Sequence, residues 1–245
     1  MYVVILAGGK GVRYSSDKPK ALAVVGNKPI IHHLMDFYDQ QGYNNFILAL
    51  GWKQEEIINY FKSLPYFGTP LHRFKITFVD TGQETHTGKR LKLIEHYIPK
   101  DNENFFVNYV DGLSNVNLTK LYERHMIHKN ISTLTAVRPT NQFGELIFDN
   151  NDNVIQFEEK PKLHSYINGG FFIFNRKIFN YIDENKNQEL EKDILVELAQ
   201  HHQLGAYKHD SFWQTLNTAK DEIHLNNIYR DCEKQNKEPI WLRIK

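Results

Sequence analysis

The stretch LAGGKGVRYSSDKPK, from Leu6 to Lys20, constrains the fold more than any other part of the chain. It follows MYVVI, a β-branched run that is typical of a fully buried strand. A turn and an amphipathic helical pattern come after it, with Pro29 near the first turn and Gly42 as the stop. The glycines therefore fall at the carboxyl end of a first strand, which is where ligands bind in open α/β sheets.

Glycines and cations together make this stretch a candidate phosphate cradle. Without a Cβ, a glycine lets backbone N–H groups approach a polyanion and can adopt left-handed dihedrals. The pattern favours a loop that binds a phosphorylated nucleotide, and the alternative is a glycine-rich turn with solvated lysines. The residues that suggest the cradle are Gly8, Gly9, Gly11, Arg13, Lys18 and Lys20.

Two common glycine motifs do not match this loop. A dinucleotide fingerprint needs glycine or alanine three residues after Gly11, where the chain has Tyr14, and this disfavours a nicotinamide-dependent oxidoreductase. A Walker loop needs Ser or Thr after its Gly-Lys pair, but Lys10 is followed by Gly11. The nucleotide-binding hypothesis therefore rests on a different glycine motif.

Strand-like and helical patterns alternate over the first half of the chain. This alternation predicts an α/β fold, namely a Rossmann-like, doubly wound and mostly parallel sheet with helices on both faces. Three later strand-like segments, ELIFD, NVIQFEE and GGFFIFN, predict a small antiparallel insertion over the active site. No long linker interrupts the chain, so we expect a single domain over residues 1–245. Helices are expected over residues 28–41, 53–64 and 117–129, and a last one after an N-cap at Asn217 or Thr218.

The composition places the chain among ordinary globular proteins, with 41% hydrophobic and 24% charged residues. A net charge of +1 argues against a chain-wide role in binding nucleic acid or a membrane surface. Cys232 is the single cysteine, which excludes an internal disulfide and a cysteine metal cluster. The chain also shows no secretory leader and no apolar run of ~20 residues, so we expect a cytoplasmic protein.

Asp111 is the candidate metal ligand. It ends the strand-like segment NFFVNYVDG, and a carboxylate at that edge can share Mg²⁺ with substrate phosphates. The alternative is a plain Asp-Gly turn after a strand. His125 and His128 have no carboxylate or cysteine at zinc-site spacing, so we expect no metal role for them.

The motifs of this chain resemble those of the sugar-phosphate nucleotidyltransferase family. LAGGKGVRY followed by PKAL is similar to the family signature LAGGxGTRL with a downstream PKP. Four further segments, VDTGQETHTGKRLK, VIQFEEKP, INGGFF and SFWQTLNT, follow in the order of motifs in glucose-1-phosphate cytidylyltransferases. Together the matches extend from residue 1 to about residue 222.

The resemblance implies a role for each matched residue. Arg13 and Lys20 are the expected catalytic residues: Arg13 would hold the triphosphate, and Lys20 would bridge the attacking phosphate and the α-phosphate. The implied nucleotide contacts are Leu6, Ala7, Gly8, Gly9, Gly11, Thr87, Gly88 and Arg90. The implied acceptor contacts are Glu159, Lys160, Asn168 and Gly169, and the implied ligands of a Mg²⁺ cofactor are Asp111 and Asn217.

Four departures from the family pattern surround the expected site: Val12, Tyr14, Ala21 and Asn217. Asn217 stands where the family has an aspartate. An amide oxygen can coordinate Mg²⁺ but brings no charge, so weaker metal binding is expected.

The resemblance implies transfer of CMP from CTP to a small phosphorylated metabolite, led by glucose 1-phosphate, for surface polysaccharide or capsule biosynthesis. A non-glucose or non-sugar phosphate is the alternative acceptor. A catalytically inactive nucleotide-binding protein on this fold is the alternative function. No nucleic-acid or membrane partner is expected, and the tail KQNKEPIWLRIK is open to packing on the body or to pairing in a homo-oligomer.

Overall fold

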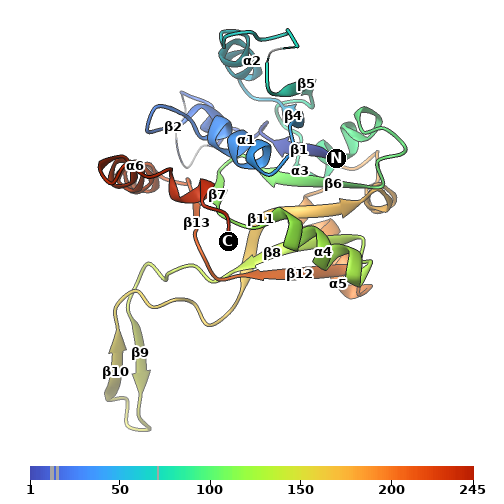
Figure 1. Cartoon of the computed structure of the whole chain (residues 1–245). Helices are drawn as coiled ribbons and strands as arrows, with labels where there is room; N and C mark the ends of the chain where they lie inside the picture. The colour runs from blue at the N-terminus through green and yellow to red at the C-terminus, as the bar shows by residue number, and fades with distance from the viewer. Residues whose placement is uncertain (12–13, 15–16, 71) are drawn as a thin grey trace.

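The computed structural model describes residues 1–11, 14, 17–70 and 72–245. Within these residues, a seven-stranded sheet forms the centre of the molecule (Figure 1). Neighbouring strands run parallel, except that strand β11 (Ile167–Asn175) runs antiparallel to both of its neighbours. In spatial order the strands are β12 (Leu204–His209), β8 (Ser132–Val137), β11 (Ile167–Asn175), β6 (Asn104–Tyr109), β1 (Tyr2–Leu6), β4 (Asn45–Leu50) and β5 (Lys75–Asp80).

The central strand β1 explains why the sheet carries apolar cores on both faces. Alternate side chains of a strand point to opposite faces. Val3 and Ile5 enter one apolar cluster, whereas Val4 and Leu6 enter the other. All four side chains are buried, so a strand of this kind appears in the sequence as a continuous apolar run.

Helices cover both clusters. Those on the Val3 side are α1 (Ile30–Gln40), α2 (Gln54–Lys62), α4 (Leu118–His128) and α6 (Ala219–Lys234). Those on the Val4 side are α3 (Thr87–Leu93), α5 (Leu195–Gln200) and the π-helical turn Leu190–Ile194. The expected α/β fold, with a Rossmann-like and doubly wound sheet, is confirmed. Thr218 rather than Asn217 is the N-cap of α6, where it forms a capping box with Asp221.

Short elements complete the fold. The antiparallel pairs are β2 (Val24–Val25) with β3 (Lys28–Pro29), β7 (Gly112–Ser114) with β13 (Trp213–Thr215), and β9 (Glu145–Phe148) with β10 (Val154–Glu158). The 3-10 turns are Lys20–Leu22, Glu95–Tyr97, Arg176–Tyr181 and Ile240–Leu242. No described helix has the length and apolar character needed to cross a membrane.

The antiparallel insertion differs from the expected arrangement. The segment GGFFIFN lies in β11, where it pairs with β6 and β8 in the main sheet. The remaining hairpin, β9 and β10, projects away from the body (Figure 1). Eight of the nine residues in its two strands are exposed.

The C-terminal tail packs on its own chain. Trp241 is fully buried, and its ring lies 5.1 Å from that of His33 on α1. The Trp241 Nε1–H donates to His33 Nδ1 at 3.3 Å, so His33 Nε2–H is free to donate to the Val25 carbonyl at 2.7 Å. This pair of contacts requires a neutral imidazole.

We expect the free energy of unfolding to fall as the pH drops from about 6.5 towards about 4. Burial lowers the pKa of His33 from 6.5 to about 4, and burial likewise lowers the pKa of His125 to about 4. Between these values the unfolded chain binds protons that the folded chain excludes, so this stabilisation is complete above about pH 6.5 and is lost on acidification. Urea unfolding at a series of pH values measures the slope.

His128, an exposed histidine on α4, provides the matched control for this prediction. His128→Gln should leave the pH slope unchanged. A wild-type stability that stays constant from about pH 7 to about pH 5 would contradict the prediction.

Candidate functional site

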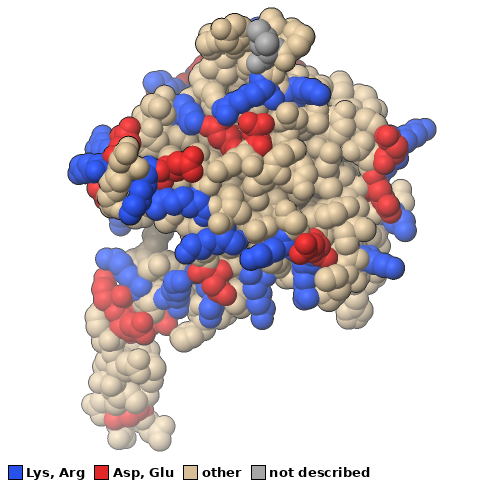
Figure 2. Space-filling model, viewed as in Figure 1, with Lys and Arg blue, Asp and Glu red and all other residues tan. Residues whose placement is uncertain are grey.

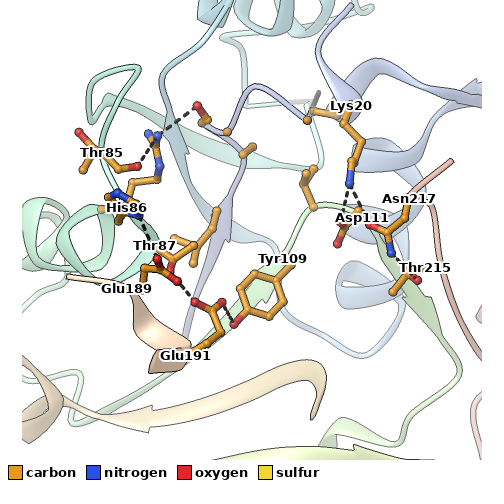
Figure 3. Close-up of a pocket in the computed structure, with 18 of the residues that line it drawn as sticks. Lys20, Thr85, His86, Thr87, Tyr109, Asp111, Glu189, Glu191, Thr215 and Asn217 are labelled. Atoms are coloured by element: carbon orange, nitrogen blue, oxygen red, sulfur yellow. Dashed lines mark hydrogen bonds and ion pairs between the residues drawn. The ribbon is translucent and has the colours of Figure 1, made fainter. Parts of the chain in front are cut away.

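A cavity of about 680 Å³ opens at the carboxyl ends of β1 and β6, which are parallel neighbours (Figure 3). After β1 the chain continues to β4 on one side of it, whereas β6 lies on the other side, so the strand order reverses here. Ligands bind at such switch points in open α/β sheets. The described residues that line the cavity are Leu6, Ala7, Gly8, Gly9, Gly11, Lys20, Ala21, Thr85, His86, Thr87, Arg90, Tyr109, Val110, Asp111, Asn168, Glu189, Glu191, Trp213, Thr215 and Asn217.

At one end of the cavity, a lysine ammonium contacts two side-chain oxygens (Figure 3). Lys20 Nζ donates to Asp111 Oδ2 at 2.9 Å and to Asn217 Oδ1 at 3.1 Å. The Lys20 side chain is 11% exposed and that of Asp111 is 23% exposed, so the ion pair is shielded from solvent but still accessible from the cavity. The structure therefore brings together one predicted catalytic residue and both predicted metal ligands.

The short antiparallel pair of β7 and β13 explains how residues so distant in sequence meet. Thr215 lies opposite Gly112, directly after Asp111, and the Leu216 N–H donates to the Asp111 carbonyl at 2.8 Å. The Asn217 Nδ2 group donates to Thr215 Oγ1 at 3.0 Å, which turns Asn217 Oδ1 towards Lys20. The pairing register thus sets the orientation of the Asn217 amide.

Arg90 lies beneath the glycine loop as a buried cation, with only 3% of its surface exposed. Its guanidinium donates to the Leu50 carbonyl at 2.9 Å, to the Gly8 carbonyl at 3.1 Å and to the Thr85 carbonyl at 2.8 Å, and it also contacts Thr81 Oγ1. All four acceptors are neutral groups, so these hydrogen bonds do not offset the positive charge of the guanidinium beside the cavity. Burial lowers the pKa of Arg90 below its usual range.

The path of the Arg90 side chain explains one of the glycines and contributes to the need for a second. A Cβ on Gly8 would lie 1.9 Å from the Arg90 Nη1 atom, and a Cβ on Gly51 would lie 2.7 Å from the same atom. At Gly51 the Gly82 carbonyl oxygen is closer still, at 2.4 Å, so the backbone excludes a larger residue there as well. Gly11 serves a different purpose, because its φ of +58° lies in the left-handed region that glycine adopts readily.

The opposite wall of the cavity is acidic and polar (Figure 3). Glu191, on the π-helical turn, accepts a hydrogen bond from Thr87 Oγ1 at 2.8 Å and another from the Tyr109 hydroxyl. Burial and the neighbouring Glu191 carboxylate raise the pKa of the Tyr109 phenol above its usual range. Thr87 Oγ1 also accepts a hydrogen bond from the Leu190 N–H at 2.9 Å, which fixes the hydroxyl of Thr87 in place.

The predicted acceptor residues separate into two groups. Asn168 lines the main cavity, and with Gly169 it also lines an adjoining recess of about 50 Å³. The Gly169 carbonyl accepts a hydrogen bond from Trp213 Nε1 at 2.8 Å. Glu159 and Lys160, by contrast, pair with each other at 3.2 Å, are more than half exposed, and are not among the described lining residues.

The predicted nucleotide contacts lie almost entirely at the cavity. Gly88 is the exception, because it packs against the segment that precedes the π-helical turn. Its N–H donates to the Gln188 carbonyl at 3.1 Å. A Cβ there would lie 2.9 Å from that carbonyl oxygen. Arg13 and Val12 lie outside the described residues. The described lining residues among the predicted nucleotide contacts are Leu6, Ala7, Gly8, Gly9, Gly11, Thr87 and Arg90.

Most residues of the acidic wall are not among the site residues expected from the sequence. Tyr109 ends β6 two residues before Asp111, and this position at a strand end is a usable signal. Glu189 and Glu191 leave no comparable signal, because Glu189 caps and Glu191 belongs to a π-helical turn of five residues, which is too short to show periodicity. Trp213 and Thr215 belong to a three-residue strand that is too short to show alternation.

Comparisons with known proteins agree on one family. Residues 2–231 match the profile described as Nucleotidyl transferase. The glucose-1-phosphate cytidylyltransferase of Salmonella typhi is 35% identical over 249 residues, covering 94% of this chain and 96% of that protein. The D-glycero-alpha-D-manno-heptose 1-phosphate guanylyltransferase of Aneurinibacillus thermoaerophilus is 32% identical and covers 80% of this chain and 84% of that protein. The solved structure of HddC from Yersinia pseudotuberculosis, complexed with GMP-PN, shares the fold at a TM-score of 0.70, with 23% identity over 92% of this chain and 98% of that chain.

Arg90→Lys should destabilise the fold although it keeps the positive charge. A single ammonium cannot bond four acceptors in three different segments, and each lost hydrogen bond to a charged group costs about 1.5–3 kcal/mol. We expect a loss of at least about 2 kcal/mol in the free energy of unfolding, measured by urea denaturation.

Lys89→Gln is the matched control, because Lys89 is the preceding residue on α3 and is half-exposed. This change should alter stability by no more than about 0.5 kcal/mol. An Arg90→Lys variant as stable as wild type would show that these hydrogen bonds do not hold the loops together.

Proposed function

Because the chain belongs to the nucleotidyl transferase family, we propose that it transfers CMP from CTP to a small phosphorylated acceptor and releases pyrophosphate. The observation that supports this proposal most directly is the convergence of Lys20, Asp111 and Asn217 at one end of the cavity. An ammonium and two oxygens of this kind are suited to phosphate groups and to a divalent cation. The glycine loop, with the charge of Arg90 beneath it, lines the same cavity.

In the proposed reaction, an oxygen of the acceptor phosphate forms a bond to the α-phosphorus of CTP. The bond between that phosphorus and the oxygen of the leaving pyrophosphate breaks. The chain's contribution is to position two anions and to offset their charge, which is the main protein contribution to phosphoryl-type transfer. Lys20 is proposed to contact the attacking phosphate and the α-phosphate, and Arg13, by resemblance alone, to hold the triphosphate.

Asp111 and Asn217 fit a Mg²⁺ site. Their side-chain oxygens face one cation, the Lys20 ammonium, at 2.9 and 3.1 Å. One carboxylate and one amide oxygen, supplemented by substrate phosphates, form a donor set that Mg²⁺ accepts. When bound, the ion would offset the negative charge of the phosphate oxygens, and it would compete with Lys20 for the same two protein oxygens.

The choice of CTP is supported by the name of the Salmonella relative and by the motif that contains Thr87 and Gly88. A relative named as a guanylyltransferase is 32% identical to this chain, so membership of the family does not determine which nucleotide base is used. A site that hydrogen-bonds the polar edge of one base leaves buried groups unpaired when another base binds. We propose that Thr87 and its neighbours discriminate in this way.

Glucose 1-phosphate is the leading proposed acceptor. The Glu191 carboxylate, the Tyr109 hydroxyl and the Asn168 amide provide polar groups in and around the cavity for sugar hydroxyls. We further propose that the reaction takes place in the cytoplasm and supplies surface polysaccharide biosynthesis. The assignment of Glu159 and Lys160 to the acceptor stays a prediction.

Pyrophosphate release with CTP and a panel of sugar phosphates, polyol phosphates and other small phosphates tests the proposal. We expect turnover with CTP and glucose 1-phosphate, a kcat/KM for UTP lower by orders of magnitude, and a kcat about 10²–10³-fold lower in Lys20→Ala. Lys75→Ala, an exposed lysine on β5, should behave as wild type.

Equal kcat/KM values for CTP and UTP would contradict the base assignment. Turnover with another phosphate but not with glucose 1-phosphate would overturn the sugar assignment and leave cytidylyl transfer in place.

Asn217→Asp should lower the Mg²⁺ concentration that gives half-maximal turnover. The substitution adds a negative charge beside Asp111 without changing the size of the side chain, and Mg²⁺ prefers carboxylate oxygens. Asn217→Ala, which removes the oxygen, should raise that concentration. A higher Mg²⁺ requirement in Asn217→Asp would show that Asn217 does not support the metal.

A further inference from the structure

Tyr14 stands where the family signature has leucine, and its hydroxyl makes a contact that leucine cannot make. The Tyr14 hydroxyl donates to Glu222 Oε2 at 2.8 Å, although the two residues are 208 positions apart in the chain. Glu222 lies in the first turn of α6, whereas Tyr14 closely follows the glycines that line the main cavity. The contact therefore joins the glycine loop to α6.

A short path of contacts leads from Tyr14 to Lys20. The Tyr14 N–H donates to the Gly11 carbonyl at 2.8 Å. Gly11 lies directly against Lys20, because a Cβ placed on Gly11 would lie 3.2 Å from the Lys20 Cβ. The Lys20 ammonium in turn contacts Asp111 and Asn217 at 2.9 and 3.1 Å. Because closely packed groups transmit a displacement to their neighbours, a shift of Tyr14 would reach the base of the Lys20 side chain.

The first turn of α6 also fixes Asn217, one of the two groups that Lys20 contacts. Asn217 precedes the N-cap residue Thr218. The Asp221 carboxylate accepts hydrogen bonds from the Asn217 N–H at 3.0 Å and from the Thr218 N–H at 2.9 Å. Asn217 and Glu222 therefore belong to one rigid helix end, and Glu222 reaches from it to the glycine loop.

The same helix holds the chain on the other side of Lys20. Asn226 Oδ1 accepts a hydrogen bond from the Gly26 N–H at 2.9 Å, and Asn226 Nδ2 donates to the Val24 carbonyl at 3.1 Å. Val24 and Gly26 belong to the hairpin of β2 and β3, which follows the 3-10 turn that begins at Lys20. The outer side of α6 carries charges of both signs (Figure 2), so these contacts come from its inner side. α6 therefore contacts the chain both before and after Lys20.

We propose that Tyr14 is a positioning residue for the transfer reaction, because its hydrogen bond to Glu222 keeps Gly11 packed against Lys20. This inference rests on the proposed function, in which Lys20 contacts the attacking phosphate and the α-phosphate. Tyr14 is not among the described lining residues of the cavity, so it acts through Gly11 and Lys20 rather than by contact with a substrate. A misplacement of about 1 Å in such a group can cost about 10²-fold in rate.

The need for such support follows from the lysine side chain. An ammonium on a flexible four-carbon stem loses much rotamer freedom when it is held in one place. Gly11 confines the stem at its base, and Asp111 and Asn217 confine the ammonium at its end. The Tyr14 ring also packs against the larger apolar cluster, so a role in packing alone would need the ring but not the hydroxyl. Tyr14→Phe separates these two roles.

Steady-state pyrophosphate release with CTP and the best acceptor of the panel provides the first test. Tyr14→Phe should lower kcat by about tenfold or more and change the KM for CTP by no more than about twofold, because the lost support acts on the transition state. Glu222→Gln keeps an acceptor oxygen and should retain kcat within about threefold, whereas Glu222→Ala should match Tyr14→Phe. The double variant Tyr14→Phe and Glu222→Ala should be no slower than either single variant, because both changes break the same contact.

Access to the Lys20 amine provides a second readout, which does not depend on turnover. Trace acetylation of the folded protein, followed by mass spectrometry of its peptides, measures the labelling rate of each lysine. The Lys20 side chain is 11% exposed, so labelling in the wild type should be slow. Tyr14→Phe should raise the Lys20 rate by about fivefold or more, since local opening follows the loss of a supporting contact. Lys75, the exposed lysine on β5, should be labelled at the same rate in both proteins.

Tyr43→Phe is the matched control. Tyr43 is another half-buried tyrosine of the same apolar cluster, and it lies two residues before β4, at the edge of the sheet opposite the cavity. This change should leave kcat and the labelling of Lys20 as they are in the wild type.

A Tyr14→Phe variant with the wild-type kcat, or with unchanged labelling of Lys20, would overturn the positioning role. Additive losses in the double variant would also overturn it, because Tyr14 and Glu222 would then act separately. A wild type that turns over no acceptor would contradict the proposed function instead, and the labelling of Lys20 would still decide whether Tyr14 holds this lysine.

Discussion

One buried guanidinium organises the candidate site. Removing an arginine from water costs several kcal/mol, and this cost is offset only when its donors find well-placed acceptors. Arg90 finds them in the glycine loop after β1, at the end of β4 and in the loop between β5 and α3. These three segments must therefore keep a common geometry, and Gly8 leaves the room that the side chain needs. The shape of the glycine loop depends on this arrangement.

The cavity has two chemically distinct ends. Lys20, Asp111 and Asn217 form an end in which a cation contacts oxygens, whereas Glu191 and Tyr109 form an acidic and hydroxyl-rich wall. In the proposed reaction the phosphate groups would lie at the first end, where Lys20 and a bound Mg²⁺ would offset their charge, whereas the Glu191 carboxylate at the second end would repel them. A substrate with a phosphate on one side and hydroxyl groups on the other would thus have one favourable orientation, which is consistent with the proposed transfer to a sugar phosphate.

The sheet and the hairpin of β9 and β10 differ in how far they bury their apolar side chains. Within the sheet, Val3 and Phe106 lose their contact with water. In the hairpin, Phe148 and Phe157 keep more than half of their surface in water, because the hairpin stands away from the body. Burial of apolar surface is the dominant favourable term in folding. The stability of the fold therefore comes from the sheet and the helices on it rather than from the hairpin.

The sequence by itself determined β1, the glycine loop at its carboxyl end and the place of Asp111 after β6. A strand that is buried on both faces gives a continuous apolar run, and glycine or Asp-Gly marks the point where such a strand ends. The sequence also determined the α/β class through the alternation of strands and helices. Only the tertiary structure decided that Asn217 and Asp111 both contact Lys20, that Glu191 lines the cavity and that Lys160 is not among its described lining residues. Local periodicity reports which side of an element is buried, but it carries no information about the pairing register of three-residue strands or the path of irregular segments. Those depend on contacts between residues far apart in the chain.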